Sequence, residues 1–479
     1  MSAKERIAQL EQENRELRAK LAEAYQQIAQ LTERLQQVEG QLAKDSQNSS
    51  KPPSSDGAAR QSRSQRKASG KKTGGQTGHA GRTLMQAVTP DEVLPHRPVL
   101  CAHCQHSLEG VPGQVKERRQ VHDLPPLRLL VREHQMEEVR CPHCQHLNRA
   151  EFPAGVEAPV QYGPNVRALA VYLHQYQLIP LARTCEWLSE LCECQLSQGT
   201  LTTWVEFAAA KLKETVEGIA DWLSASRLQH ADETGIRIGG KLHWLHVNST
   251  SELSHLAWHA KRGKQALEAI GIWPRFQGRA MHDRWKSYDH YGCAHSICGA
   301  HLLRDCTYVA EQEQQPWAAE MHDLLVSMAV AAAEWRQRGA SAVPAQERDE
   351  WVAQYFELLS SGFAAQPLPK AEQVPKQGRR GKQSPAKNLL DDLLRRAEQV
   401  LAFLDDLRIP FTNNQAERDV RMAKVQQKIA GTFRSEDGAT AFCRIRSYLS
   451  TMRKQGHAML AALAAVFADQ PLPVAWSPV

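Results

Sequence analysis

Three short acidic segments, far apart in the chain, carry the residue types that bind divalent cations. They are HADETG around Asp232, MHDRWKSYDHY around Asp283 and TNNQAERDVR around Glu417. Two aspartates at strand ends and one helical glutamate can hold two Mg²⁺ (or Mn²⁺) ions, because these ions prefer carboxylate oxygens. Such an ion pair activates an oxygen nucleophile and neutralises the leaving oxygen of a phosphodiester. We therefore expect Asp232, Asp283 and Glu417 to be catalytic residues and magnesium ligands, with Asp232 bridging the two ions.

Each acid also has an alternative interpretation. The first could be a hairpin-edge residue, Asp289 could replace the second, and Asp419 or Glu436 could replace the third. Each motif alone is weak evidence for a metal site. Their order along the chain and their placement on predicted strands and a helix make the set stronger.

The segments around the first two acids predict a sheet. LQHADETGIRI and KLHWLHV are strand-like runs joined by Gly239 and Gly240, which is a hairpin signal. HLAWHA predicts a third strand, KQALEAIG a helix, and GRAMHD a fourth strand that ends at Asp283. This β-β-β-α-β order is that of the ribonuclease H-like fold, in which Asp232 and Asp283 come together.

The third acid lies on a predicted helix, NQAERDVRMAKVQQKIAG, which Thr412, Asn413 or Asn414 caps and Gly431 ends. Basic residues accompany the acids, and we expect them to contact DNA phosphates. They are Arg284, Lys286, Arg418, Arg421, Lys424, Lys428 and Arg434. Trp285 and Tyr288 could stack on an unpaired base or pack in the core.

A second basic region lies nearer the N-terminus. No Asp or Glu occurs from Gly57 to Pro90, although the net charge of the chain is only +6. The run predicts contact with a polyanion, and a merely solvated linker is the alternative. The expected DNA-binding residues there are Arg63, Arg66, Lys67, Lys71 and Lys72.

Four of the eleven cysteines form two similar knuckles. Cys101 and Cys104 lie in CAHCQH, and Cys141 and Cys144 lie in CPHCQH. Each CxxC pair can place two thiolates on one tetrahedral Zn²⁺, so we expect one structural zinc in a small ribbon that binds DNA. Four buried free thiols are the alternative. Histidines that could replace a thiolate are His103, His106, His143 and His146.

Cys298 and His301 form a separate CxxH pair, with His295 close by. A second zinc site would need more ligands than the sequence pattern supplies. Helix packing, or support of Asp283, is therefore the preferred interpretation of this pair.

Residues 7–42 carry a heptad pattern uninterrupted by proline, with Asn14 at one seam position. A lone helix of this length cannot bury its apolar stripe, so we expect a self-associating coiled coil. Packing of this helix on the body of its own protein is the alternative. Helical patterns from Gly163 to Leu223 predict either a helix-turn-helix or plain helical packing, and Ser197 is expected to cap the last helix.

Together these patterns predict a multidomain α+β protein. The expected order is a coiled-coil oligomerisation helix (1–45), a flexible basic linker (46–95), a zinc-ribbon DNA-binding module (96–155), a helical segment (160–223), a first part of a ribonuclease H-like core (224–310), a helical insertion (311–407), a second part of the core with the Glu417 helix (408–456) and a C-terminal tail (457–479).

The location of the protein is also predicted by composition. No apolar run reaches about 18 residues, which excludes a typical membrane-spanning helix. The N-terminus lacks the apolar core of a signal peptide, and CxxC pairs fit a reducing compartment. We expect a cytoplasmic protein with no membrane partner.

The chain resembles a known family, the insertion-sequence-66 type of bacterial DDE transposase. The matching segments are NSSKPPSSD, the twin CxxC knuckles, HADETG with GKLHWLHV, DRWKSY followed by CGAHLLRD, and NNQAERDVRMAKVQQKIAGTFRS. The resemblance implies a leucine-zipper-like N-terminus, a zinc-binding DNA module and a DDE core in which the acidic triad falls on Asp232, Asp283 and Glu417.

The same resemblance implies cleavage and strand transfer at terminal inverted repeats, target DNA as the second substrate, and association with the nucleoid. It also implies accessory proteins encoded by the same element. Two alternatives remain: a ribonuclease H-like nuclease or Holliday-junction resolvase, and a noncatalytic, domesticated DNA-binding transposase. Joined DNA products would exclude the first, and loss of function on changing the acids would exclude the second.

Overall fold

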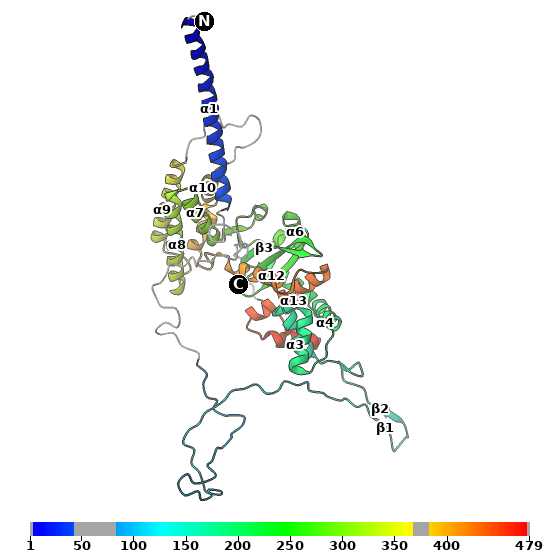
Figure 1. The fold of residues 1–479 in the computed structure, drawn as a ribbon. Coiled ribbons are helices and arrows are strands. Elements are labelled where there is room, and N and C mark those ends of the chain that lie inside the picture. Colours follow the sequence, from blue (N-terminus) through cyan, green and yellow to red (C-terminus); the bar gives the residue numbers. More distant parts are fainter. Residues whose placement is uncertain (1–2, 43–82, 367–382, 477–479) are drawn as a thin grey trace.

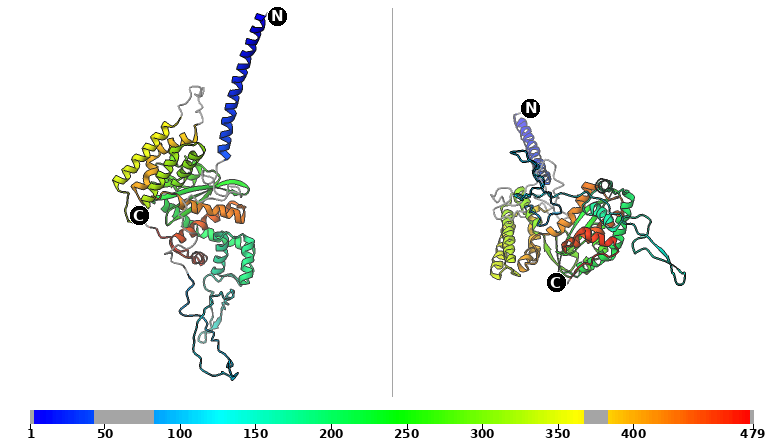
Figure 2. Two further views of the ribbon diagram at one scale, coloured as in Figure 1. Left: turned by 60° about the vertical axis from the view of Figure 1, so that its left-hand side comes forward. Right: turned by 90° about the horizontal axis from the view of Figure 1, so that it is seen from below.

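The structure is a computed structural model that describes residues 3–42, 83–366 and 383–476. Within these ranges it is a mixed α+β protein built from helices and a mixed five-stranded sheet, as expected. Helix α1 (Ala3–Leu42) projects from one end of the molecule, and the segment with the short strands β1 (Glu138–Arg140) and β2 (Leu147–Arg149) extends from the other (Figures 1 and 2). The expected basic residues 63–72 lie outside the described ranges.

The sheet has the strand order β5-β4-β3-β6-β7. β3 (Leu228–Ile238), β4 (Lys241–Ser249) and β5 (Ser254–His259) form an antiparallel meander. β6 (Arg279–His282) joins the other side of β3 in parallel, and β7 (Ala294–Ile297) joins β6 in parallel. The β-β-β-α-β order predicted from the sequence is therefore present, and β3 is the central strand.

The hairpin between β3 and β4 turns at the predicted glycine pair. Ile238 pairs with Lys241, so the loop has two residues, and Gly239 and Gly240 have φ angles of 54° and 78°. A two-residue loop with positive φ at both positions matches the right-handed twist of the strands, and glycine adopts it without steric cost. This turn fixes the register that places Asp232 opposite Val247.

Different elements cover the two faces of the sheet. Side chains of α12 (Asn414–Ala430) and α13 (Glu436–Lys454) pack on one face with apolar residues of β3, β4 and β5. Helix α6 (Lys264–Ile270) and the segment from Trp273 to Cys293 pack beneath the opposite face, against Ala231 and Ala280. Because side chains alternate along a strand, neighbouring residues of β3 face different layers.

The segment before the sheet is helical, as expected, and α13 joins it to the core. It comprises α2 (Pro164–Val171), the π-helical turn η2 (Tyr172–Tyr176), α3 (Leu181–Cys192), α4 (Gln198–Lys211) and α5 (Lys213–Ser224). Ser197 caps α4, since its hydroxyl accepts the Thr200 N–H at 3.0 Å. Leu201, Trp204 and Ala208 of α4 pack against α13 and α14 (Met459–Phe467). A helix-turn-helix role stays a prediction.

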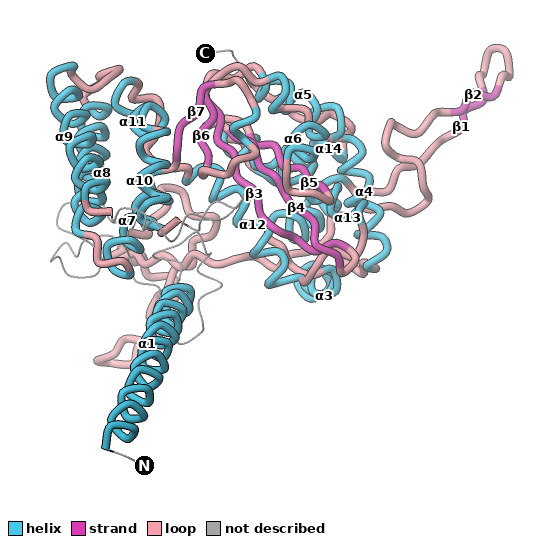
Figure 3. Tube along the Cα trace, turned by 90° about the horizontal axis from the view of Figure 1, so that it is seen from above, coloured by secondary structure: helices cyan, strands magenta, loops and turns pink. Residues whose placement is uncertain are grey.

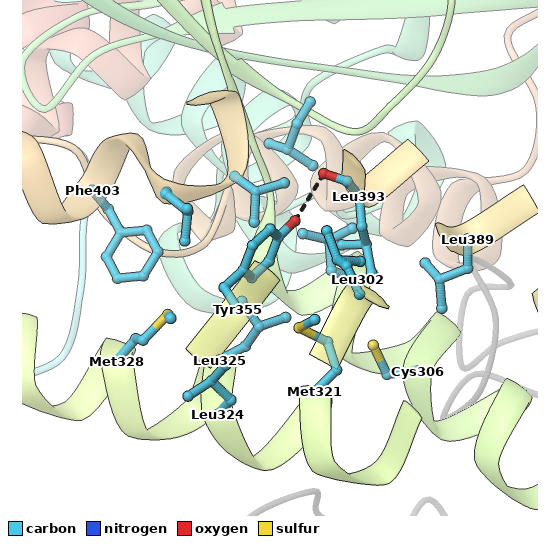
Figure 4. Packing of buried hydrophobic residues seen from close by; sticks show 14 of the residues in the cluster. Leu302, Cys306, Met321, Leu324, Leu325, Met328, Tyr355, Leu389, Leu393 and Phe403 are labelled. Carbon is cyan, nitrogen blue, oxygen red and sulfur yellow. Dashed lines mark hydrogen bonds between the residues drawn. The ribbon is translucent and has the colours of Figure 1, made fainter. Parts of the chain in front are cut away.

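Between β7 and α12 the chain forms a helical bundle. It comprises α7 (Gly299–Gln312), α8 (Pro316–Gln337), α9 (Ala345–Ala364), α10 (Pro385–Arg395) and α11 (Ala397–Asp405). Its interior is a continuous apolar cluster in which the Tyr355 hydroxyl donates to the Leu393 carbonyl at 2.9 Å (Figure 4). The sheet lies between this bundle and the helices α4, α13 and α14 (Figure 3).

No helix in the described part of the chain is long and apolar enough to span a membrane.

Candidate active site

The register of the central strands brings the first two acids together. β3 and β6 run parallel, and their last paired residues are His230 and Met281. Asp232 and Asp283 each follow two residues later. Asp283 lies just beyond the end of β6, as expected, whereas Asp232 lies within β3 opposite Val247 and not at a strand end. The Asp283 Oδ1 accepts the backbone N–H of Trp285 at 2.9 Å, which orients this carboxylate as the chain leaves β6.

The third acid comes from α12, which packs on the same strands. Glu417 lies in the first turn of this helix, where the positive end of the helix dipole favours a carboxylate. Its Oε1 lies 3.9 Å from the Cys298 Sγ and 3.9 Å from the His301 Nδ1, both at the start of α7. The N-termini of α7 and α12 therefore meet beside the sheet.

Asn413 joins these elements. It occupies the N-cap position of α12, within the predicted set, but its side chain makes no capping bond. Its amide Nδ2 instead donates to the Ala231 carbonyl at 2.7 Å, its Oδ1 lies 2.9 Å from the His230 Nδ1, and its backbone N–H donates to Cys298 Sγ at 3.2 Å. Asn413 thus fixes the start of the Glu417 helix to the strand that carries Asp232.

Asp232 lies among other negative charges. Burial raises the pKa of Asp232 well above its usual value, and the charges of Glu233, Asp283 and Glu417 raise it further. The Asp232 Oδ1 accepts the Glu233 backbone N–H at 2.8 Å. Among the described residues, Asp232 forms no ion pair with a basic side chain. Carboxylate oxygens that repel one another and lack a paired cation are the donor type that Mg²⁺ or Mn²⁺ prefers. The residue types therefore suit such ions, although among the described residues the three acids are not a group whose ligand atoms all lie within 4.8 Å of one another.

The adjacent carboxylate, Glu233, has a different environment that sequence reasoning missed. Its Oε1 accepts from the Arg262 Nε at 2.9 Å and Nη2 at 2.6 Å, and its Oε2 accepts from the Tyr288 hydroxyl. Burial and the nearby charge of Asp283 raise the pKa of Glu233 to about 7, although Tyr288 and Arg262 oppose that shift. The signal in the sequence was the acidic pair itself, since strand alternation must turn one member away from the other.

Arg262 also packs between two indole rings. Its guanidinium lies 4.9 Å from the Trp244 ring and 4.4 Å from the Trp285 ring. Trp285 follows Asp283 by two residues, so the Glu233–Arg262 pair supports the loop that leaves β6. Tyr288 is buried and stacks on Trp273 at 4.5 Å between ring centroids, which assigns it to the core.

The competing acids have other partners or positions. Asp289 pairs with the buried guanidinium of Arg396. Asp419 accepts from the Lys454 ammonium at 3.0 Å and from Ser254 at 2.9 Å. Glu436 is exposed at the start of α13. These contacts favour Asp283 and Glu417 as members of the site.

The predicted phosphate-binding residues fall into two groups. Lys286 is exposed, as are Arg418, Arg421, Lys428 and Arg434. Arg418 and Arg421 line an open hollow together with Asn414 and Glu417. Arg284 instead lies between Asp305 and Asp392, and the Lys424 ammonium donates to the Gly235 carbonyl. For these two residues the structure shows internal contacts, and a role in DNA binding stays a prediction.

The two cysteine knuckles have the same local geometry. In each, the residue after the second cysteine donates its backbone N–H to the carbonyl of the first cysteine at 2.9 Å. The backbone N–H of Cys104 lowers the pKa of Cys101, and that of Cys144 lowers the pKa of Cys141. Among the described residues, however, no three of these thiols lie together as one ligand set. The zinc ribbon stays a prediction.

Comparison with known proteins identifies two family matches. Residues 159–441, more than half of the chain, match the model of the transposase IS66 family. Residues 2–84 match a family of unknown function (DUF6444). No match to this chain is found among curated proteins. The first match spans all three acidic segments, both flanking helix N-termini and the helical bundle.

Proposed function

Because the chain belongs to the IS66 transposase family, we propose that it cleaves DNA at the ends of a mobile element and joins those ends to target DNA. The observation that carries this proposal is the strand register that sets Asp232 beside Asp283, with Glu417 close enough to raise the pKa of Asp232. We assign the core to the ribonuclease H-like fold on its strand order.

The proposed roles follow from the positions of the carboxylates. Asp232, on the central strand, would hold a pair of divalent ions together with Asp283 and Glu417, whose charges both raise the pKa of Asp232. These ions would activate the attacking oxygen and neutralise charge on the leaving oxygen. Two hydrogen bonds orient the carboxylates: the Trp285 backbone N–H holds Asp283, and the Asn413 side chain holds the start of the Glu417 helix.

DNA would approach over the start of α12. Glu417 lines an open hollow with Arg418 and Arg421, and Lys286 is exposed on the loop after Asp283. Cations at these positions would contact phosphates on both sides of the cleaved bond. The expected zinc ribbon and the basic run before residue 83 would add sequence-independent affinity for DNA.

We propose that α1 joins protomers into an oligomer. Its large apolar side chains remain exposed along the predicted seam, with Leu17, Ile28 and Leu31 between 58% and 65% exposed. A parallel partner helix would cover this stripe. Two DNA ends could then be held by one assembly. Accessory proteins of the same element remain further expected partners.

The decisive experiment is a strand-transfer assay with Mg²⁺, labelled duplexes that carry the element ends, and a supercoiled target plasmid. The wild-type chain should give joined products, and Glu417→Gln should give neither cleavage nor joining. Glu436→Gln, an exposed glutamate on the next helix, is the matched control. Cleaved but never joined ends would favour a nuclease or resolvase. Equal products from wild type and Glu417→Gln would exclude this glutamate from the mechanism.

A further inference from the structure

We propose that Cys298, His301 and Glu417 form a second metal site, which takes a borderline-soft ion such as Zn²⁺ and thereby withdraws Glu417 from catalysis. The inhibitory part of this inference rests on the proposed function. The binding part does not, because it concerns only the geometry of three side chains. None of the three belongs to the cysteine knuckles.

The geometry is that of ligands around one small ion. One donor atom from each residue lies within 4.8 Å of the other two. The Glu417 Oε1 is 3.9 Å from the Cys298 Sγ and 3.9 Å from the His301 Nδ1. Bond lengths of about 2.0–2.3 Å at tetrahedral angles separate zinc ligands by roughly 3.5 Å, so small side-chain movements would close the site.

The His301 imidazole needs a partner for its buried Nδ1. The His301 Nδ1 is buried and makes no hydrogen bond among the described residues. A buried nitrogen without a partner costs free energy, and 3.9 Å is too long for a hydrogen bond to Glu417. A metal ion between these two atoms would satisfy both.

The surrounding elements place two helix N-termini at the site and leave a path to solvent. Cys298 is the N-cap residue of α7, and Glu417 lies in the first turn of α12. The helix dipoles favour negative charge, but burial and the charge of Glu417 raise the pKa of the Cys298 thiol to about 12, so a bound ion must displace the thiol proton. Glu417 also lines the open hollow beside Arg418, through which an ion could enter.

The donor set distinguishes this site from that of the three acids. Thiolate and imidazole ligands select Zn²⁺ and related ions, whereas the carboxylates of Asp232 and Asp283 suit Mg²⁺. Glu417 is common to both sets. A Zn²⁺ ion held by Cys298 and His301 would therefore draw this carboxylate away from the other two acids and lower the rate of DNA cleavage.

The binding test is a Co²⁺ titration of the full chain without a polyhistidine tag, because a cobalt–thiolate bond absorbs in the near ultraviolet. Wild type should bind one equivalent more than Cys298→Ser and His301→Gln. Cys306→Ala, a buried cysteine farther along α7, is the matched control and should bind as wild type does. His301→Cys should restore the lost equivalent with stronger thiolate absorption, which a merely structural role for His301 would not produce.

The inhibition test measures DNA cleavage in Mg²⁺ with added Zn²⁺, each variant being compared with its own rate without Zn²⁺. The Zn²⁺ concentration for half inhibition should rise at least tenfold in Cys298→Ser. Equal Co²⁺ equivalents in wild type, Cys298→Ser and His301→Gln would overturn the site. A lost equivalent with unchanged Zn²⁺ sensitivity would overturn the inhibitory role. A chain that binds the extra ion but never cleaves DNA would refute the proposed function and leave the site standing.

Discussion

The sheet core and the cysteine segment build their candidate sites in different ways. In the core, strand pairing, the burial of apolar helix faces and the contacts of Asn413 determine where residues 232, 283 and 417 lie. In the segment from 83 to 158, each knuckle closes on its own backbone hydrogen bonds, and nearly all side chains are exposed. Packing can thus position the elements that carry the three carboxylates without an ion, whereas the four thiols would need an ion to join them.

We expect the largest effect from removing zinc, which should unfold the cysteine segment and leave the core folded. Structural Zn²⁺ contributes about 10–16 kcal/mol in small zinc modules, so Cys144→Ser should leave residues 96–155 without a stable fold. Limited proteolysis with mass spectrometry would show cleavage confined to this segment. His143→Asn is the control for the alternative ligand. Wild-type protein with no bound Zn²⁺ and the same protease resistance would refute the ribbon.

A change at the central acid should have the next largest effect. Asp232→Asn removes the bridging carboxylate and with it several kcal/mol of transition-state stabilisation, so the cleavage rate should fall at least about 10³-fold. Asp437→Asn, at the exposed start of α13, is the control and should leave the rate unchanged. A fall of less than tenfold would show that the ions are held elsewhere.

The same substitution should raise the melting temperature of the metal-free protein. The folded-state pKa of Asp232 lies above its unfolded value, so its ionised form destabilises the fold and this cost grows as pH rises above the unfolded value. Asparagine carries no charge and removes this cost. A lower melting temperature for Asp232→Asn at pH 8 would contradict this account of the electrostatics.

Within the core, the Glu233 carboxylate tests how a buried charge depends on its cation. Arg262→Ala should leave Glu233 buried without its cation and cost about 3 kcal/mol at pH 8, because the Glu233 side chain is only 1% exposed. The cost should shrink at pH 6, since a carboxyl with a pKa of about 7 is then mostly protonated. Chemical denaturation would measure both values.

Two variants test the assignment of this cost to a buried charge. Arg275→Ala breaks a surface pair with Asp221 and should cost roughly 0–1 kcal/mol. Adding Glu233→Gln to Arg262→Ala should recover part of the lost stability. If the double variant is as unstable as the single one, the loss comes from the stacking of Arg262 on Trp244 and Trp285 instead.

The sequence predicted what depends on short-range patterns. The strands around Asp232, the Gly239–Gly240 turn and the Ser197 cap are all present, because alternation, positive φ and capping act over a few residues. The transposase family is confirmed by the match over residues 159–441. The triad, coiled coil and zinc ribbon stay predictions.

What the sequence did not show depends on partners far along the chain. Arg284 is a basic residue next to Asp283, which suggested that it contacts DNA phosphates. Its ion partners are instead Asp305 and Asp392. The role of Glu233 depends on Arg262 and Tyr288, both distant in sequence. Periodicity cannot reveal such pairs, because it records which face a residue occupies and not which residue lies opposite.

Asn413 offers the smallest and most specific test of how the core is joined. Asn413→Ala leaves the buried Ala231 carbonyl and the His230 ring without their partner, which should cost roughly 1–3 kcal/mol. Asn414→Ala, one residue later and exposed, is the stability control and should cost less than about 0.5 kcal/mol.

The effect on catalysis should exceed the effect on stability. A shift of Glu417 by about 1 Å relative to Asp232 can cost about 10²-fold in rate, so Asn413→Ala should lower kcat and leave DNA affinity nearly unchanged. Single-turnover cleavage with saturating protein separates the two quantities. If only DNA affinity fell, Asn413 would instead act on the hollow that we propose binds DNA. The contact between α12 and β3 would then have only a structural role.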